Sequence, residues 1–366
     1  MEVGVADVVR EHETPQHHVA QHPAAPAWLV RWETNRPRLL MECAAECIGV
    51  FFYVFCGISA TASFYTSTVA KVAGFGSILN IALSYAVGIA FGIIVAAPTS
   101  GGHLSPCYTI AFVIFKGFPL RKAPFYILSQ ILGAFIASLF VYGAYKDQLQ
   151  PIATELRALG AVGEASIYST AGPAGVFALF PNPESSFGAV ALGEIIANAF
   201  IAILVFSVLD PSNPFVSFSS APMLIGLSYF VCIVGFAENG IALNTARDLG
   251  GRFVAGIFFG RQSFPAQYSA IAALVNIPAT IAGAAVQVFI LSDSARPQTV
   301  QIPADEVTRV ISNKSTGPNN SNHLSSAQNG NGKAHGVNEG AALKGGNMTG
   351  YLTAEEKDGF HHEQRN

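Results

Sequence analysis

Charged side chains are scarce in this sequence. Asp, Glu, Lys and Arg together make up 12% of its 366 residues, about half of the roughly 25% typical of soluble domains. The net charge is −3 and no basic patch interleaved with aromatic residues occurs, so the sequence predicts no nucleic-acid binding. With a mean hydropathy of +0.41 and 27 phenylalanines, the chain carries more apolar surface than a soluble globule can bury. We therefore expect an integral membrane protein.

The sequence also lacks the signatures of a disulfide framework, a metal site or an enzyme. Its cysteines are odd in number and lie in apolar segments, which favours buried thiols. They are Cys43, Cys47, Cys56, Cys107 and Cys232. No CxxC pair, His/Cys cluster, phosphate loop or Ser/His/Asp grouping has a spacing suited to chemistry. We expect no cofactor or metal. The first 38 residues have no apolar run long enough for the core of a signal peptide, so targeting is expected through the first span.

Six apolar stretches have the length of about 20 residues that a helix needs to cross a bilayer. They lie near Leu39–Ala60, Ile78–Ala97, Ala123–Tyr145, Gly188–Leu209, Ser217–Ala237 and Ala270–Leu291. An even number of spans places both termini on one side of the membrane. Three arginines at 31–38 precede the first span, and Lys116, Arg121 and Lys122 precede the third. This positive charge predicts cytoplasmic termini.

Two short segments interrupt the pattern of simple spans. They are Gly101–Cys107 and Gly240–Asp248, and an apolar run follows each. Neither run is long enough to cross a membrane. Each segment starts with a glycine four residues before a residue that caps helices well, Ser105 in the first and Asn244 in the second.

These two segments resemble the signature motifs of the major intrinsic proteins, the aquaporin and aquaglyceroporin family. Members carry Ser-Gly-x-His-x-Asn-Pro-Ala before the third span and Asn-Pro-Ala-Arg after the fifth. This chain has Ser-Gly-Gly-His-Leu-Ser-Pro-Cys at 100–107 and Asn-Thr-Ala-Arg at 244–247. The resemblance covers roughly Leu39 to Leu291 and includes the number of spans, the placement of both motifs and a Glu in the first and fourth spans. The long tails and the Asn/Gly-rich end resemble fungal members.

The resemblance implies an all-α membrane protein with six transmembrane helices and two re-entrant half-helices in an inverted repeat. The half-helices enter from opposite faces and direct their positive N-terminal ends to the middle of the membrane, which repels cations and interrupts a proton wire. It also implies a homotetramer. The expected organisation is a cytoplasmic tail at 1–38, a channel domain at 39–291 and, from composition, a disordered cytoplasmic tail at 292–366.

The motifs depart from the family pattern at the expected pore centre. The residues placed there by the resemblance are Ser105, Pro106, Cys107, Asn244, Thr245 and Ala246. Ser105 replaces the usual Asn, Cys107 replaces Ala, and Thr245 replaces Pro. Because Ser caps helices and Pro suits the first helical position, the half-helix can still begin here. We expect a conducting pore with a less symmetric centre; the alternative is that Ser105 only caps a helix.

The resemblance also implies a selectivity constriction, which counting without gaps from the motifs places at Tyr85, Cys232, Ile241 and Arg247. Gly88 suggests an alternative shift of two residues in the second span. Arg247 would repel cations and donate hydrogen bonds to a passing oxygen; a structural salt bridge is the competing role. The small Cys232, together with Asp248 and Arg252, matches the aquaglyceroporin version of the family.

Three further polar residues lie in or beside the spans. Glu46 and Glu194 are inside them, where an ionised carboxylate costs a few kcal/mol unless paired. Taken alone they mark a proton relay, whereas the resemblance implies that each braces a re-entrant loop. His103 precedes the first half-helix near the cytoplasmic pore mouth. It either lines the pore and changes charge with pH or holds the loop by a hydrogen bond.

The function implied is a passive channel for glycerol and water in a lipid bilayer, either the plasma membrane or an internal membrane such as the vacuolar one. Three alternatives remain open at this point. A bulky Tyr85 would narrow the pore to water or hydrogen peroxide. The altered motifs and long tails would also suit a non-conducting sensor or adhesion protein. A proton-coupled transporter would use Glu46 or Glu194.

Overall fold

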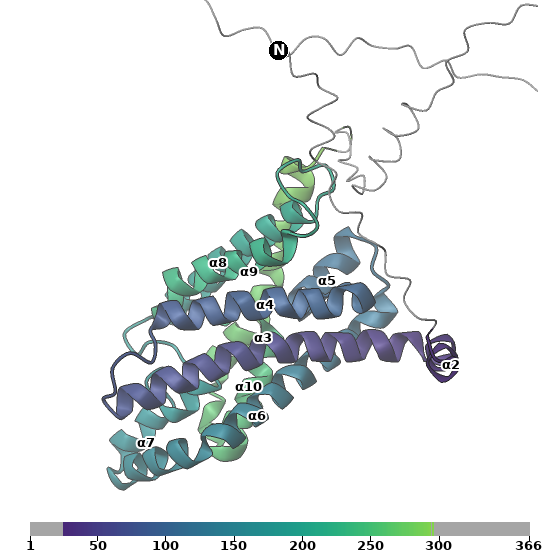
Figure 1. Cartoon of the computed structure of the whole chain (residues 1–366). Helices are drawn as coiled ribbons and strands as arrows, with labels where there is room; N and C mark the ends of the chain where they lie inside the picture. Colours follow the sequence, from purple (N-terminus) through teal and green to yellow (C-terminus); the bar gives the residue numbers. More distant parts are fainter. Residues whose placement is uncertain (1–24, 294, 296–366) are drawn as a thin grey trace, which may run out of the picture. The chain divides into compact units, whose positions relative to one another are not determined.

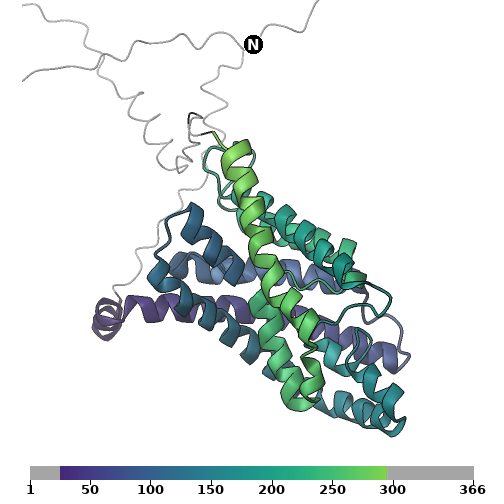
Figure 2. The ribbon, with the colours of Figure 1, turned by 180° about the vertical axis from the view of Figure 1, so that it is seen from behind.

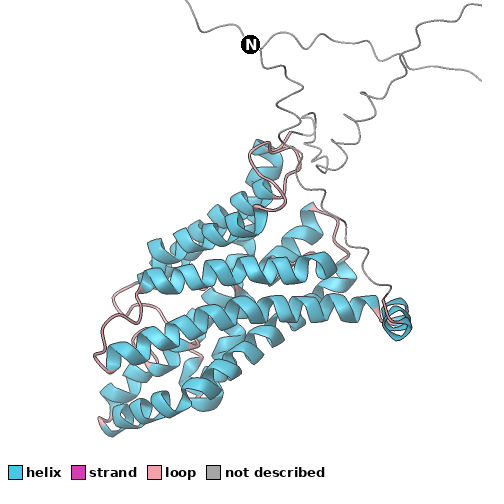
Figure 3. Ribbon diagram, in the orientation of Figure 1, coloured by secondary structure: helices cyan, strands magenta, loops and turns pink. Residues whose placement is uncertain are grey.

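The structure is a computed structural model that describes residues 25–293 and residue 295. Within them every regular element is helical (Figure 3), as a bilayer requires of segments that satisfy their own backbone hydrogen bonds. The α-helices are α2 (Ala27–Asn35), α3 (Arg38–Val69), α4 (Ile78–Ser100), α5 (Pro106–Phe115), α6 (Ala123–Ala158), α7 (Ala161–Ile167), α8 (Phe187–Val208), α9 (Ala221–Phe236), α10 (Thr245–Phe258), α11 (Ala266–Ala270) and α12 (Asn276–Val286). Residues 1–24 and nearly all of the predicted C-terminal tail lie outside the described residues.

Among the described residues, five helices are long and apolar enough to cross a membrane. They are α3, α4, α6 with the 3₁₀ turn before it, α8, and one continuous helix at Ala266–Leu291. This last helix joins α11 and α12 with π-helical stretches at Ile271–Val275 and Gln287–Leu291. The predicted fifth span is α9, which has 16 residues. It begins at Ala221 instead of Ser217 because side-chain hydrogen bonds close a turn between Ser217 and Ser220.

The third span is longer than the sequence predicts. Helix α6 continues past Tyr145 to Ala158, so the first part of the predicted loop 146–187 is helical. The extension contacts the far end of α10, where Arg157 Nη2 donates a hydrogen bond to the carbonyl oxygen of Phe259 at 2.9 Å. This contact explains why the polar residues there stay helical outside the apolar run.

The spans form two halves of equivalent packing (Figures 1 and 2). Helix α3 packs against α4 and α6, and α8 packs in the same way against α9 and α12. The half-helices are exchanged, because α5 packs against α12 and α10 packs against α6. Glycines allow matching close approaches: Gly133 lies against the Cys47 carbonyl and Gly283 against the Ala199 carbonyl. The inverted repeat implied by the sequence is the architecture observed.

The outward faces of the spans carry large apolar side chains. Leu128 and Phe140 on α6 are 67% and 62% exposed, and Phe91 on α4 is 49% exposed. A continuous apolar surface of this kind suits lipid rather than water. All five cysteines are free thiols, of which Cys107 and Cys232 are buried. The other three are only half-buried, so the expectation of buried thiols is wrong for them.

Candidate transport pore

Each half-helix is preceded by one non-glycine residue with a left-handed backbone. Leu104 has φ of 52° and Leu243 has φ of 59°, a conformation that costs a residue with a side chain about 1–2 kcal/mol. It turns the chain into the N-cap residues Ser105 and Asn244, from which α5 and α10 begin. The same strained turn therefore starts both half-helices.

Glu46 of α3 holds the first of these turns. Its carboxylate accepts hydrogen bonds from the backbone N–H groups of His103 at 2.9 Å and Leu104 at 2.8 Å. Ser100 Oγ and Gln130 Nε2 donate to it at 2.6 and 2.7 Å. The side chain is fully buried, and these bonds replace the water that burial removes.

Glu194 of α8 holds the second turn in the same manner. It accepts from the N–H groups of Ala242 at 2.7 Å and Leu243 at 2.8 Å, and from Asn198 Nδ2 at 2.9 Å. Both oxygens of Glu46 and of Glu194 thus have partners within the protein. Neither residue lines the cavity that runs through the bundle, which is the geometry of a brace rather than of a proton relay.

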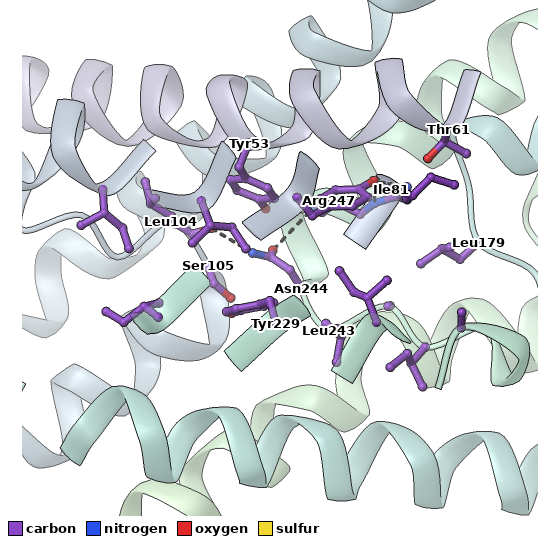
Figure 4. A pocket seen from close by; sticks show the side chains of 18 of the residues that line it. Tyr53, Thr61, Ile81, Leu104, Ser105, Leu179, Tyr229, Leu243, Asn244 and Arg247 are labelled. Carbon is purple, nitrogen blue, oxygen red and sulfur yellow. Dashed lines mark hydrogen bonds between the residues drawn. The ribbon is translucent and has the colours of Figure 1, made fainter. Parts of the chain in front are cut away.

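Asn244 joins the two half-helices. Its Oδ1 accepts from the N–H groups of Ala246 at 2.9 Å and Arg247 at 3.2 Å, which caps α10. Its Nδ2 donates to the carbonyl oxygen of Leu104 at 2.9 Å, directly before α5 (Figure 4). The N-terminal ends of α5 and α10 therefore lie against each other, and their positive dipole ends converge.

Ser105 lies at the N-cap position of α5, directly before Pro106, but its side chain makes no capping bond. Its hydroxyl is buried and has no hydrogen-bond partner among the described residues. The residue lines the cavity. The alternative that Ser105 only caps the helix is therefore wrong, because its hydroxyl makes no capping hydrogen bond.

Thr245 connects α10 to the last span, a role that the sequence did not reveal. Its Oγ1 lies 3.0 Å from the carbonyl oxygen of Ala273 and 3.0 Å from Asn276 Oδ1. The Ala273 carbonyl belongs to the π-helical stretch, where the wider turn changes the backbone bonding pattern. Cys107 Sγ of α5 lies 3.7 Å from the same hydroxyl. Proline in place of Thr245 would offer none of these contacts.

A cavity of about 1190 Å³ passes through the bundle. At one end it is lined by Tyr65 and Val69 of α3, and at the other by Leu209 and Phe218 between α8 and α9. Residues from both half-helix entries line it between these ends. The cavity therefore follows the path expected of a pore.

Arg247 and Tyr85 meet on the wall of this cavity. Arg247 Nε and Nη2 donate to the Tyr85 hydroxyl oxygen at 2.9 and 2.7 Å, and Nη1 donates to the carbonyl oxygen of Phe177 at 2.9 Å. A guanidinium has five N–H donors, so two remain for a passing molecule. Within the described chain Arg247 takes part in no salt bridge, which removes the support for a purely structural ion pair.

Ile241 lines the cavity with Tyr85 and Arg247, but Cys232 does not. The Cys232 thiol is directed toward the carbonyl oxygen of Ala197 on α8, at 3.8 Å. Its neighbour Ile233 faces the cavity instead. Counting without gaps therefore chose a residue one position away from the lining, and one position turns a helical side chain by about 100°.

Asp248 and Arg252 form a fully buried ion pair away from the lumen. Arg252 Nη2 lies 2.7 Å from Asp248 Oδ1. The same guanidinium donates to the carbonyl oxygens of Ser263 at 2.7 Å and Leu179 at 2.8 Å. The pair therefore connects α10 to the loop before α8 and to the turn after α10, and it does not line the cavity.

His103 both lines the cavity and holds its loop. Its Nδ1 lies 3.2 Å from Thr109 Oγ1 on α5. The ring packs edge-on against Phe112 and Phe118, with centroids 4.8 and 4.5 Å away. The position of His103 is therefore compatible with both roles that the sequence left open, lining the pore and holding the loop.

Besides Tyr65 at one end of the cavity, three further lining tyrosines were not predicted from the sequence. Tyr53 of α3, Tyr108 of α5 and Tyr229 of α9 line the cavity, and Figure 4 shows Tyr53 and Tyr229 on its wall. Each lies inside an apolar run, where an aromatic residue reads as packing or lipid contact. The spacing of seven residues between Glu46 and Tyr53, two helical turns, was the one available sign that both face inward.

Membrane helices in two inverted halves, with paired half-helices meeting in a continuous cavity, define a channel of the aquaporin fold. Residues 33–290 match the family model described as Major intrinsic protein. The chain belongs to the major intrinsic protein family, which is a family of channels.

Individual relatives agree with this assignment. Aquaporin-3 of Laccaria bicolor is 42% identical over 292 residues, covering 77% of this chain and 87% of that protein. A glycerol uptake facilitator protein of Pseudomonas aeruginosa is 34% identical over 219 residues, covering 58% of this chain and 74% of that protein. The X-ray structure of the aquaglyceroporin from Plasmodium falciparum matches with a TM-score of 0.59 at 24% identity, over 69% of this chain and 97% of that one. This last match is a likeness of fold.

Proposed function

We propose that the protein is a passive channel for glycerol and water. The observation that carries this is the wall formed by Arg247, Tyr85 and Ile241. Two free N–H donors of Arg247 can bind a permeant hydroxyl, while Ile241 offers an apolar surface to carbon. Glycerol has both kinds of surface. The glycerol uptake facilitator among the relatives supports the same reading.

The charge distribution supports the passage of uncharged molecules only. Arg247 is 5% exposed and keeps its positive charge without a carboxylate partner in the described residues. The N-terminal ends of both half-helices add positive potential nearby. Cations are therefore repelled along the same stretch that binds hydroxyl groups.

Stopped-flow light scattering on proteoliposomes tests the proposal. Vesicles containing the protein should shrink and reswell in a glycerol gradient faster than protein-free vesicles, and they should also equilibrate water faster. The rates should not change when a pH gradient is collapsed, because Glu46 and Glu194 are committed to bracing. Rates equal to those of protein-free vesicles for both solutes would refute the proposal.

A pore limited to water and hydrogen peroxide is the second candidate. It is favoured by the aromatic lining, since five tyrosines line the cavity. Measured on the same vesicles, this candidate predicts fast water and peroxide fluxes with glycerol at the background rate.

We further propose that the channel domain at 39–291 assembles as a homotetramer with one pore in each subunit, and that both termini are cytoplasmic. The positive charge before the first and third spans supports this orientation. The exposed Trp28 and Trp32 on α2 suit a headgroup region next to the first span. Protease protection of tagged termini in sealed vesicles tests the orientation, and crosslinking in membranes tests the tetramer.

A further inference from the structure

Tyr53 carries a hydroxyl that nothing in the described protein satisfies. The residue is 3% exposed, lines the cavity, and its OH has no hydrogen-bond partner among the described residues. Ser105 is 2% exposed and is in the same situation. A buried polar group without a partner is costly, so native proteins rarely keep one without a reason. Here two such groups lie on the wall of one cavity.

The surroundings of these hydroxyls are aromatic and polar at once. Figure 4 shows Tyr53, Ser105, Asn244 and Tyr229 gathered at the place where the half-helices meet. Tyr108 of α5 lines the same cavity and is 6% exposed. The rings come from α3, α5 and α9, so they approach the lumen from three directions and narrow it.

The hydrogen-bonding character of this place differs from that of the Arg247–Tyr85 wall. There the Tyr85 oxygen already accepts two N–H groups, and the free groups of Arg247 only donate. A hydroxyl both donates and accepts. Of the two N–H groups of Asn244 Nδ2, one is bound to Leu104. The free hydroxyls of Tyr53 and Ser105 therefore supply the acceptors that the first wall lacks.

We propose that Tyr53, Ser105, Tyr108 and Tyr229 form a second selectivity site, called here the tyrosine site. It binds the O–H group of a permeant by donating and accepting in turn, and its rings limit the width of the permeant. Because a permeant gives up its water shell in the narrow lumen, these hydroxyls replace the lost hydrogen bonds. The proposal rests on the proposed channel function and adds a specificity determinant to it.

Removal of single hydroxyl groups tests the binding part. Tyr53→Phe keeps the ring, and Ser105→Ala removes the other free hydroxyl. Each should lower glycerol permeability about fivefold, the effect of losing roughly one hydrogen bond at the barrier, and water permeability should fall as well. Tyr145→Phe on α6, which does not line this cavity, is the matched control and should conduct like the wild type. Thermal unfolding of Tyr53→Phe should be unchanged or shifted upward, because the lost hydroxyl has no protein partner.

The possible results distinguish a failure of the tyrosine site from a failure of the proposed channel function. Wild-type flux that both variants retain within twofold would overturn the tyrosine site and leave the channel intact. If Tyr53→Phe lost flux and also had a lower unfolding temperature, Tyr53 would have a structural role, and the tyrosine site would likewise be overturned. A wild-type protein that conducts neither glycerol nor water would overturn both proposals.

Widening the site tests the size limit. Tyr229→Leu replaces a ring by a shorter side chain that still suits the apolar helix α9. Vesicles with this variant should admit a five-carbon polyol that the wild type excludes. Continued exclusion, with glycerol flux retained, would show that the rings do not set the limit.

Discussion

At the scale of single residues, the pore wall depends on neutral partners for a buried charge. Arg247 is buried and surrounded by hydroxyl and carbonyl oxygens, with no carboxylate salt bridge in the described structure. A carboxylate would neutralise the charge and use up its donors. The neutral partners fix the guanidinium in place and leave its field and two N–H groups for the lumen.

Tyr85→Phe should destabilise the protein, whereas Tyr53→Phe should not. The first change removes the oxygen that accepts two N–H groups from Arg247, and hydrogen bonds to charged groups contribute about 1.5–3 kcal/mol. Thermal unfolding in detergent, with both variants measured side by side, compares two tyrosines of the same cavity. Equal stability of Tyr85→Phe and the wild type would contradict the role given to this contact.

At the scale of elements, each re-entrant turn depends on one carboxylate. Glu46 and Glu194 each accept two consecutive backbone N–H groups, and they hold Leu104 and Leu243 in the left-handed conformation. Neither turn has the covalent restraint that a disulfide would give. Because Glu46 and Glu194 make equivalent contacts, the same substitution at either residue should reduce stability and flux in the same way.

Glu194→Gln and Glu46→Gln should each destabilise the fold by about 1–3 kcal/mol, because the glutamine NH₂ group faces an N–H group that then has no acceptor. Glycerol and water fluxes should fall together, with or without a pH gradient. Unfolding curves and stopped-flow rates measure the two effects. A variant of normal stability that lost flux only under a proton gradient would instead point to proton coupling.

Asp210 connects the loop after α8 to the end of the last helix. Burial by itself would raise the pKa of Asp210, but hydrogen bonds from Ser212, Ser292 and Gln287 outweigh it and lower the pKa below its usual value. A lowered folded-state pKa means that this stabilisation is complete above the unfolded-state pKa, near 4. It is lost as the pH falls through the folded-state value.

Asp210→Asn should therefore lower the unfolding temperature at pH 7 and reduce its dependence on pH below about 4. Scans of the wild type and the variant between neutral and acid pH measure this. Parallel curves for the two proteins would show that Asp210 does not contribute to the acid sensitivity.

At the scale of the whole molecule, sequence reasoning reached the architecture because its signals are repeated. Two motifs, two glutamates and two sets of three spans occur at matching positions, and the structure repeats its strained turns, braces and helix crossings in the same way. Arg247 and Tyr85 followed from their fixed distance to the motifs. Span lengths were less accurate at α3, which continues past Ala60 to Val69, and at α6 and α9, where contacts with α10 and a serine turn set the helix ends.

What the sequence could not supply depends on the direction of side chains. Cys232 and Ile233 are neighbours in an apolar helix, and only the rotation of α9 decides which one faces the lumen. Tyr53, Tyr108 and Tyr229 look like lipid or core residues until the bundle places them around one cavity. The contact of Thr245 with the last span depends on the π-helical stretch at Ile271–Val275, which no sequence motif predicts.

The central claim is that solutes pass through the cavity where the two half-helices meet. Ile241→Cys places a thiol on its wall beside Arg247, while the wild type, whose Cys232 does not line the cavity, serves as the control. Stopped-flow flux should fall in Ile241→Cys after treatment with a small methanethiosulfonate reagent and should recover with reductant, and the wild type should not respond. Full labelling of the introduced cysteine with unchanged flux would contradict the account.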